Sequence, residues 1–149
     1  MSLKTPVKNL KATERGINQN LFLVTVGVTI VAMIMMTVAF FSRGAFPPDK
    51  MSMFYLGVVI VYSFHKELLR WLGEDHVERQ GEYFVYGWIG LTTSLYVLDF
   101  ITRGYFSLSP HGEKLFALRE IASLTVEILI IFVLTRGLKI LKVIWEHRA

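Results

Sequence analysis

One acidic residue lies inside a long apolar run of this sequence. Residues 124–134 read LTVEILIIFVL, so Glu127 is flanked on both sides by apolar residues. An ionisable group inside a membrane span is costly and usually faces the interior of a helix bundle, where it has a partner. His65 follows a second apolar run, and helical spacing predicts that it reaches a similar depth. A His–Glu pair at that depth could hold a proton, because histidine titrates near neutral pH.

Two further acids extend this candidate polar site. Glu120 lies seven residues before Glu127 and therefore on about the same face of a helix. Asp99 lies near the end of a third apolar run, so it competes with Glu120 and Glu127 for any basic side chain that pairs with them. The sequence therefore predicts an intramembrane polar site formed by Glu127, His65, Glu120 and Asp99.

Two kinds of role fit such a site. One is proton- or cation-coupled transport centred on Glu127 and His65. The other is structural: Glu127 hydrogen-bonds across a helix interface, or it lies at an interface between copies of the chain. Within the chain, the hydroxyl groups that could form a hydrogen bond with Glu127 belong to Tyr62, Ser63, Thr92 and Thr93.

The apolar runs indicate a membrane protein. The chain has 149 residues, of which 53% are hydrophobic, and crossing a bilayer as a helix takes about 20 apolar residues. Continuous apolar runs, rather than alternation, favour helices over a β-barrel. We therefore predict an all-α fold, a single domain over 1–149 that forms an integral membrane bundle of four transmembrane helices. The expected spans are 21–41, 51–71, 83–102 and 115–135.

The basic residues predict the orientation. Five of the 16 Lys and Arg residues fall in the segments on one side, and the other eleven fall at the two ends of the chain, in the last part of the second span and in the connection after it. Because cytoplasmic segments carry the excess of Lys and Arg, both termini are predicted to be cytoplasmic, in the cell membrane. The net charge of +4 then suggests contact with anionic lipid rather than with nucleic acid.

Both ends of the chain have amphipathic patterns. An N-terminal helix on the inner leaflet would set its basic stripe against anionic head groups, although a frayed basic tail fits equally well. At the C-terminal end, the chain could extend the fourth helix or bend at Gly137 onto the surface. The predicted lipid contacts are Lys4, Lys8, Lys11, Arg15, Lys139 and Lys142.

Small residues and loop signals complete the pattern. Gly87, Gly90 and Ser94 lie in the third span, where small residues let another helix approach closely. Ser109 and Pro110 are predicted to cap and start the fourth helix, and Asp49 is a candidate cap for the second.

The motifs that are missing shape the functional prediction. The sequence has no cysteine, no phosphate-binding glycine loop and no H-E-x-x-H pattern, so no metal, cofactor or enzymatic activity is predicted. We predict a non-enzymatic membrane protein, a structural, scaffold or accessory subunit, and expect it to form a homo-oligomer or to join a larger membrane complex. The alternative is a small transporter or channel that uses Glu127 and His65.

Overall fold

The protein is all-helical. A computed structural model describes the backbone of residues 4–47, 50–71 and 81–146, and the side chains of residues 16–47, 50–71 and 82–145. Within these ranges it has four helices, as the apolar runs predicted. They are α1 (Lys4–Phe41), α2 (Met51–Trp71), α3 (Gly81–Ile101) and α4 (Ala117–Glu146).

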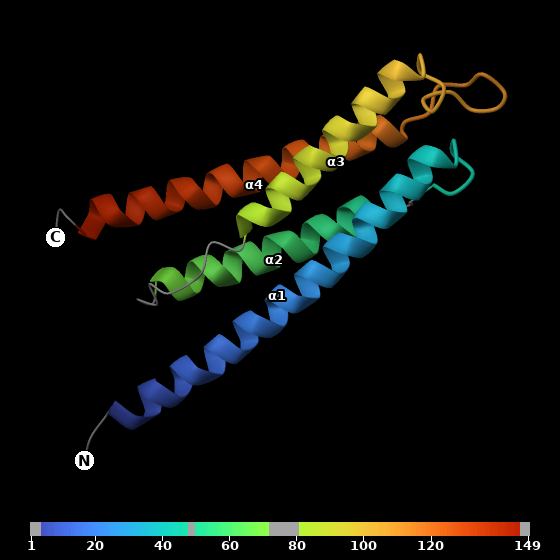
Figure 1. The fold of residues 1–149 in the computed structure, drawn as a ribbon. Helices are drawn as coiled ribbons and strands as arrows, with labels where there is room; N and C mark the ends of the chain where they lie inside the picture. The colour runs from blue at the N-terminus through green and yellow to red at the C-terminus, as the bar shows by residue number, and fades with distance from the viewer. Residues whose placement is uncertain (1–3, 48–49, 72–80, 147–149) are drawn as a thin grey trace.

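The helices lie side by side and alternate in direction (Figure 1). α2 packs mainly on α1 and α4, and α3 packs mainly on α4. The start of α1 and the end of α4 lie at the same end of the molecule, which we call the terminal end. The α1–α2 and α3–α4 connections lie at the opposite end, which we call the loop end.

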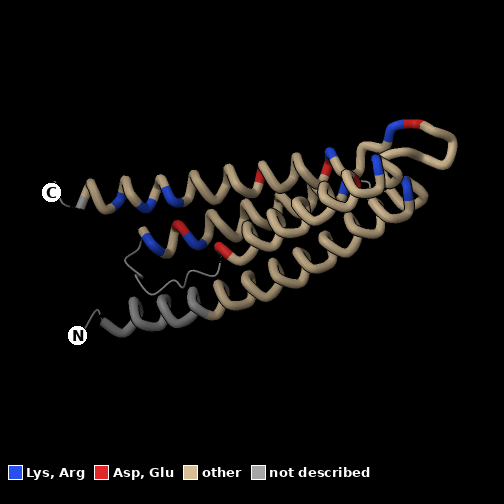
Figure 2. Tube along the Cα trace, turned by 45° about the horizontal axis from the view of Figure 1, so that its top comes forward, with Lys and Arg blue, Asp and Glu red and all other residues tan. Residues whose placement is uncertain are grey.

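Three of the four helices are long and apolar enough to cross a membrane. They are Gly16–Phe41 in α1, Glu82–Ile101 in α3 and Ala117–Trp145 in α4. α2 is not among them, because its last third contains Lys66, Glu67 and Arg70. Charged residues gather toward the two ends of the molecule, and long uncharged stretches lie between them (Figure 2). These features support a membrane protein.

Each helix buries one narrow stripe and leaves apolar side chains on its outer face. In α3 the buried residues are Val85, Trp88, Thr92 and Leu95, spaced by three and four residues. Such spacing places side chains on one face of a helix. The outer faces are also apolar, and helices that are apolar all round are typical of membrane proteins. Outward-facing examples are Ile30, Ile34, Val61, Ile89, Val97, Val126, Ile130 and Val133.

A buried chain of hydrogen bonds joins three helices. The indole Nε1 of Trp88 on α3 donates to the hydroxyl of Tyr55 on α2 at 2.8 Å. The Tyr55 hydroxyl lies 3.1 Å from Oγ1 of Thr29 on α1, and that oxygen lies 2.7 Å from the carbonyl of Thr25. A carbonyl only accepts, so Thr29 donates to Thr25 and Tyr55 donates to Thr29. A second buried contact, Thr92 Oγ1 to Thr125 Oγ1 at 2.6 Å, joins α3 to α4.

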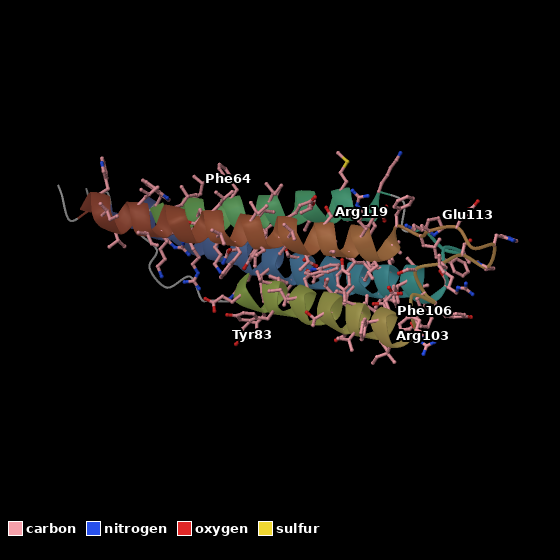
Figure 3. All side chains as sticks on the ribbon, turned by 90° about the horizontal axis from the view of Figure 1, so that it is seen from above. Phe64, Tyr83, Arg103, Phe106, Glu113 and Arg119 are labelled. Carbon is pink, nitrogen blue, oxygen red and sulfur yellow. The ribbon has the colours of Figure 1, made fainter. Side chains whose placement is uncertain are left out.

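An arginine ties the two connections together at the loop end. Arg43 Nε donates to the carbonyl of Leu108 at 2.8 Å, and Arg43 Nη2 donates to that of Ser109 at 3.0 Å. Its guanidinium also lies 4.1 Å from the centre of the Tyr105 ring. Figure 3 shows Arg103, Phe106 and Glu113 at the same end of the molecule.

The start of α4 differs from the sequence prediction. Ser109 and Pro110 do not begin the helix, which starts at Ala117. Ser109 Oγ instead accepts hydrogen bonds from the backbone N–H groups of His111 and Glu113, and Leu108 pairs with Lys114 in an isolated β-bridge. Serine side chains favour such local turns as well as helix caps, so the same signal served a different purpose. Asp49 lies outside the described residues.

Both predicted amphipathic ends continue as helix. α1 is unbroken from Lys4 to Phe41, so its first part is neither a separate surface helix nor a frayed tail. α4 continues through Gly137 to Glu146, which decides between extension and a bend. Because a long helix with an apolar stripe gains stability cooperatively, the amphipathic segments extend the spans beside them.

The Tyr55 hydrogen bonds are expected to stabilise the packing of α1, α2 and α3. Tyr55→Phe leaves the buried indole N–H of Trp88 without an acceptor, so we expect a loss of about 1–2 kcal/mol in unfolding free energy. Reversible unfolding in mixed micelles measures this loss. The matched control is Tyr96→Phe, since Tyr96 is exposed on α3. Equal stability of the two variants would contradict the role of the Tyr55 hydroxyl.

Candidate functional site

The four predicted polar residues come from three helices: His65 from α2, Asp99 from α3, and Glu120 and Glu127 from α4. Glu127 is half-buried and accepts a hydrogen bond at 3.3 Å from Ser123 of its own helix. Glu120 is exposed, about two turns nearer the start of α4. Asp99 is half-buried near the end of α3, and its buried Oδ1 has no hydrogen-bond partner in the part of the chain that the structure describes.

His65 and Glu127 lie at different depths. α4 starts at Ala117, so Glu127 is about 15 Å into its helix, whereas His65 is about 21 Å into α2. His65 is also two residues, about 200° of helix rotation, away from Ser63 and Glu67, which face α4. The proton site that combines Glu127 with His65 therefore stays a prediction.

The predicted packing residues divide between two faces of α3. Gly87 faces α1, and a Cβ atom there would lie 3.1 Å from Cε of Met33. Gly90 and Ser94 are exposed, and a Cβ atom at Gly90 would have no neighbour within 4 Å. Ser94 Oγ donates back to the Gly90 carbonyl at 2.8 Å. Gly87 thus serves packing within the chain, while Gly90 and Ser94 face outward.

The predicted lipid contacts lie at the terminal end. Lys4, Lys8, Lys11 and Arg15 belong to α1, but their side chains fall outside the described residues. Lys139 is exposed on α4. Lys142 donates from Nζ to the backbone carbonyl of Arg70 at 2.6 Å, which links α4 to the end of α2.

The main polar site of the described residues is a cavity that the sequence did not predict. It lies between α2, α3 and α4 near the terminal end and has a volume of about 100 Å³. We call it the charged cavity. Its apolar wall includes Val59, Val85, Ile128 and Phe132. Its charged lining residues are Lys66, Glu67, Arg70, Glu82, Arg136 and Lys139.

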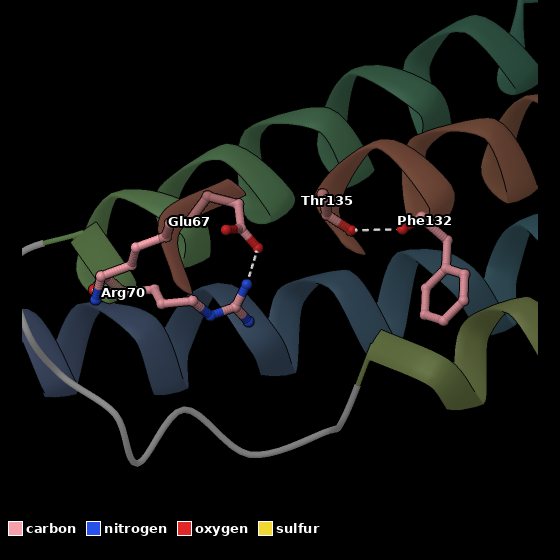
Figure 4. Close-up of polar contacts among 5 residues, drawn as sticks. Glu67, Arg70, Phe132 and Thr135 are labelled. Atoms are coloured by element: carbon pink, nitrogen blue, oxygen red, sulfur yellow. Dashed lines mark hydrogen bonds and ion pairs between the residues drawn. The ribbon is translucent and has the colours of Figure 1, made fainter. Parts of the chain in front are cut away.

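Two ion pairs bridge parts of this lining. Glu67 pairs with Arg70, one turn further along α2 (Figure 4). Glu82, at the start of α3, pairs with Arg136 of α4. The Arg136 guanidinium also lies 5.2 Å from the centre of the Phe132 ring. The second pair therefore joins the start of α3 to α4 near the terminal end.

Glu67 is the most deeply buried charged residue of the cavity. It is 7% exposed, and its Oε1 pairs with Arg70. Its Oε2 is buried without a hydrogen-bond partner among the described residues. A buried carboxylate oxygen without a partner is costly, so the cavity offers an acceptor to any donor that enters it.

The sequence held one signal for this cavity. At similar depths, 16 to 19 residues from the loop end of their helices, lie Glu67, Arg70, Glu82 and Arg136. Their similar depth alone could therefore have predicted that these residues lie close together. Their pairing depends on how each helix is rotated about its axis, and the apolar pattern does not fix that rotation because the outer faces are apolar too.

Comparison with known proteins gives no family for the chain. No protein-family model, no curated protein and no solved structure matches it. The candidate site therefore depends on the geometry of this chain alone.

Arg70 is expected to stabilise the fold because it neutralises the buried carboxylate of Glu67. Arg70→Ala leaves a buried carboxylate without its pair, so we expect a loss of about 3 kcal/mol in unfolding free energy in mixed micelles. Adding Glu67→Gln removes the unpaired charge and should restore most of that stability. A double variant as unstable as Arg70→Ala would show that Arg70 acts through other contacts.

Proposed function

We propose that the chain is a small non-enzymatic membrane protein with four transmembrane helices, which acts as a structural or accessory subunit of a membrane assembly. Both termini lie on the cytoplasmic side. The observation that carries this proposal is the outward-facing small-residue surface of α3.

The packing of α2 supports a fourth span. α2 lies between α1 and α4 and runs opposite to α1, and three of the helices are apolar enough to cross a membrane (Figure 1). If α1 and α3 cross in the same direction, the chain must return between them, and α2 is the segment that returns. Its charged last third lines the charged cavity rather than facing lipid, as charged residues in membrane spans do.

The charge distribution supports the orientation. Lys66, Arg70, Arg136, Lys139 and Lys142 all lie toward the terminal end. Segments rich in Lys and Arg stay in the cytoplasm during membrane insertion, so the terminal end is the cytoplasmic end. The cytoplasmic leaflet also carries anionic lipid, which attracts these side chains.

Gly90 and Ser94 support assembly. They are exposed near the middle of an apolar helix, and no other described helix of the chain covers them. Small residues that lie on an outer helix face let a second backbone come close, and such faces are enriched where transmembrane helices associate. A second copy of the chain fits this surface, because the same α3 face can then serve both partners.

The placement of Glu127 supports a structural role over transport. Ser123 of the same helix donates to it, and Glu127 lines neither the charged cavity nor the neighbouring apolar groove. A half-buried carboxylate held by its own helix is suited to an interface between chains. No observation in the structure favours the transport alternative.

Crosslinking through α3 tests the assembly. The protein has no cysteine, so Ser94→Cys introduces a single thiol on the proposed interface. We expect mild oxidation in membranes to give a covalent dimer of twice the chain mass. Val126→Cys is the control, since Val126 is exposed on α4 at a similar depth. No dimer with Ser94→Cys, or equal dimer with both variants, would contradict an interface on α3.

Proton flux tests the role of Glu127. Liposomes containing the wild-type protein should be no more permeable to protons than liposomes containing Glu127→Gln, because Glu127 is held by Ser123 outside any cavity described. Glu120→Gln is the matched control, an acid of the same helix that is exposed. A flux that Glu127→Gln abolishes and Glu120→Gln retains would refute the structural role and establish transport.

A further inference from the structure

We infer that the charged cavity and the apolar groove beside it bind one anionic phospholipid, whose head group carries a phosphate and a hydroxyl donor. The inference goes beyond the proposed role as a subunit. It uses the four-span topology but needs no partner protein. Four observations carry it: the depth of the cavity, its charge, the unpartnered oxygen of Glu67 and the groove.

The cavity lies at the depth of lipid head groups. Arg70, Glu82 and Arg136 are each about 19 residues from the loop end of their helix, which is about 29 Å of helix. The hydrocarbon core of a bilayer is about 30 Å thick. With the loop end at one membrane surface, all three side chains reach the head groups of the opposite leaflet.

The charge of the cavity fits an anion. Four basic and two acidic side chains line it, and the acids are already paired with Arg70 and Arg136. The described lining therefore has an excess of positive charge. A guanidinium has five N–H donors, so Arg136 can hold Glu82 and still donate to a phosphate. Lys139 is exposed at the rim, where it can contact the same phosphate.

Glu67 adds a second requirement for the ligand, which is a hydrogen-bond donor. Glu67 lines the cavity, and its Oε2 is buried without a partner among the described residues. An acceptor of this kind needs a donor. The phosphate of a phospholipid is a diester without a hydroxyl group, so the phosphate itself gives Glu67 no donor. A head group such as glycerol, attached to the phosphate, supplies the hydroxyl donor within one molecule.

The apolar groove supplies the place for an acyl chain. It has a volume of about 410 Å³, lies between α2 and α4, and shares the polar residues Ser63, Glu67 and Thr135 with the charged cavity. Along α2 it runs from Trp71 to Ile60, about 16 Å toward the middle of the membrane. The rest of its lining is apolar: Phe64, Leu68, Ile131, Leu134 and Leu138. A free phosphate compound would leave this groove unused, so the geometry favours a lipid.

Lipid retention tests the inference. The full chain, purified in detergent, is equilibrated with equal amounts of phosphatidylglycerol and phosphatidylcholine, and the bound lipid is counted by native mass spectrometry. We expect one retained phosphatidylglycerol per chain, in preference to phosphatidylcholine. Lys139→Gln should reduce that preference about fivefold, as expected for one basic residue at a lipid surface.

The control and the competitor make the result decisive. Lys114→Gln removes the same charge from an exposed residue at the loop end and should leave the preference unchanged. Glu67→Leu removes the acceptor and should also reduce it, whereas inorganic phosphate should not displace the lipid. Equal retention of the two lipids, or an equal effect of Lys139→Gln and Lys114→Gln, would overturn the inference. Displacement of the lipid by inorganic phosphate would also overturn the inference, because it would show that the cavity binds a free anion. Because retention is measured without crosslinking, its failure is distinct from failure of the α3 interface.

Discussion

The middle of a bilayer offers no hydrogen bonds, so polar groups at that depth need partners within the protein. Tyr55 meets this constraint for three helices at once, because its hydroxyl accepts from Trp88 and donates to Thr29. The contact also fixes the rotation of α2. With Tyr55 facing inward, Val59 and Tyr62 continue the buried stripe, and the residues beside that stripe face α4.

This rotation explains how α2 accommodates a charged end. Ser63 and Glu67 lie on the side that faces α4, so the acid enters the charged cavity instead of lipid. Arg70, one turn later, neutralises it, and Lys142 of α4 donates to the Arg70 carbonyl. α2 therefore lacks the long apolar span of its neighbours, and the charge of its buried Glu67 is paired within the helix by Arg70.

The sequence predicted the helices better than the site. Its apolar runs indicated four helices, and the expected range 51–71 has the bounds of α2, because runs of apolar residues limited by Gly, Pro and charged residues are strong signals. It singled out Glu127 because an isolated acid in an apolar run stands out. The charged cavity has no such signal, since its members come from three helices and mix with ordinary flanking charges. Only the relative rotation of the helices brings Glu82 to Arg136.

The end of α4 shows why local signals are incomplete. α1 and α3 both end in the pattern Ser/Thr-Arg-Gly, where Arg43 and Arg103 have φ of 53° and the following glycines have φ above 75°. The same triplet occurs at 135–137, but the helix continues through it. There Arg136 pairs with Glu82 and lies against Phe132, contacts that hold the residue in helical geometry. Apolar residues then recur along the next turns of α4, so packing and pairing override a sequence pattern that elsewhere ends a helix.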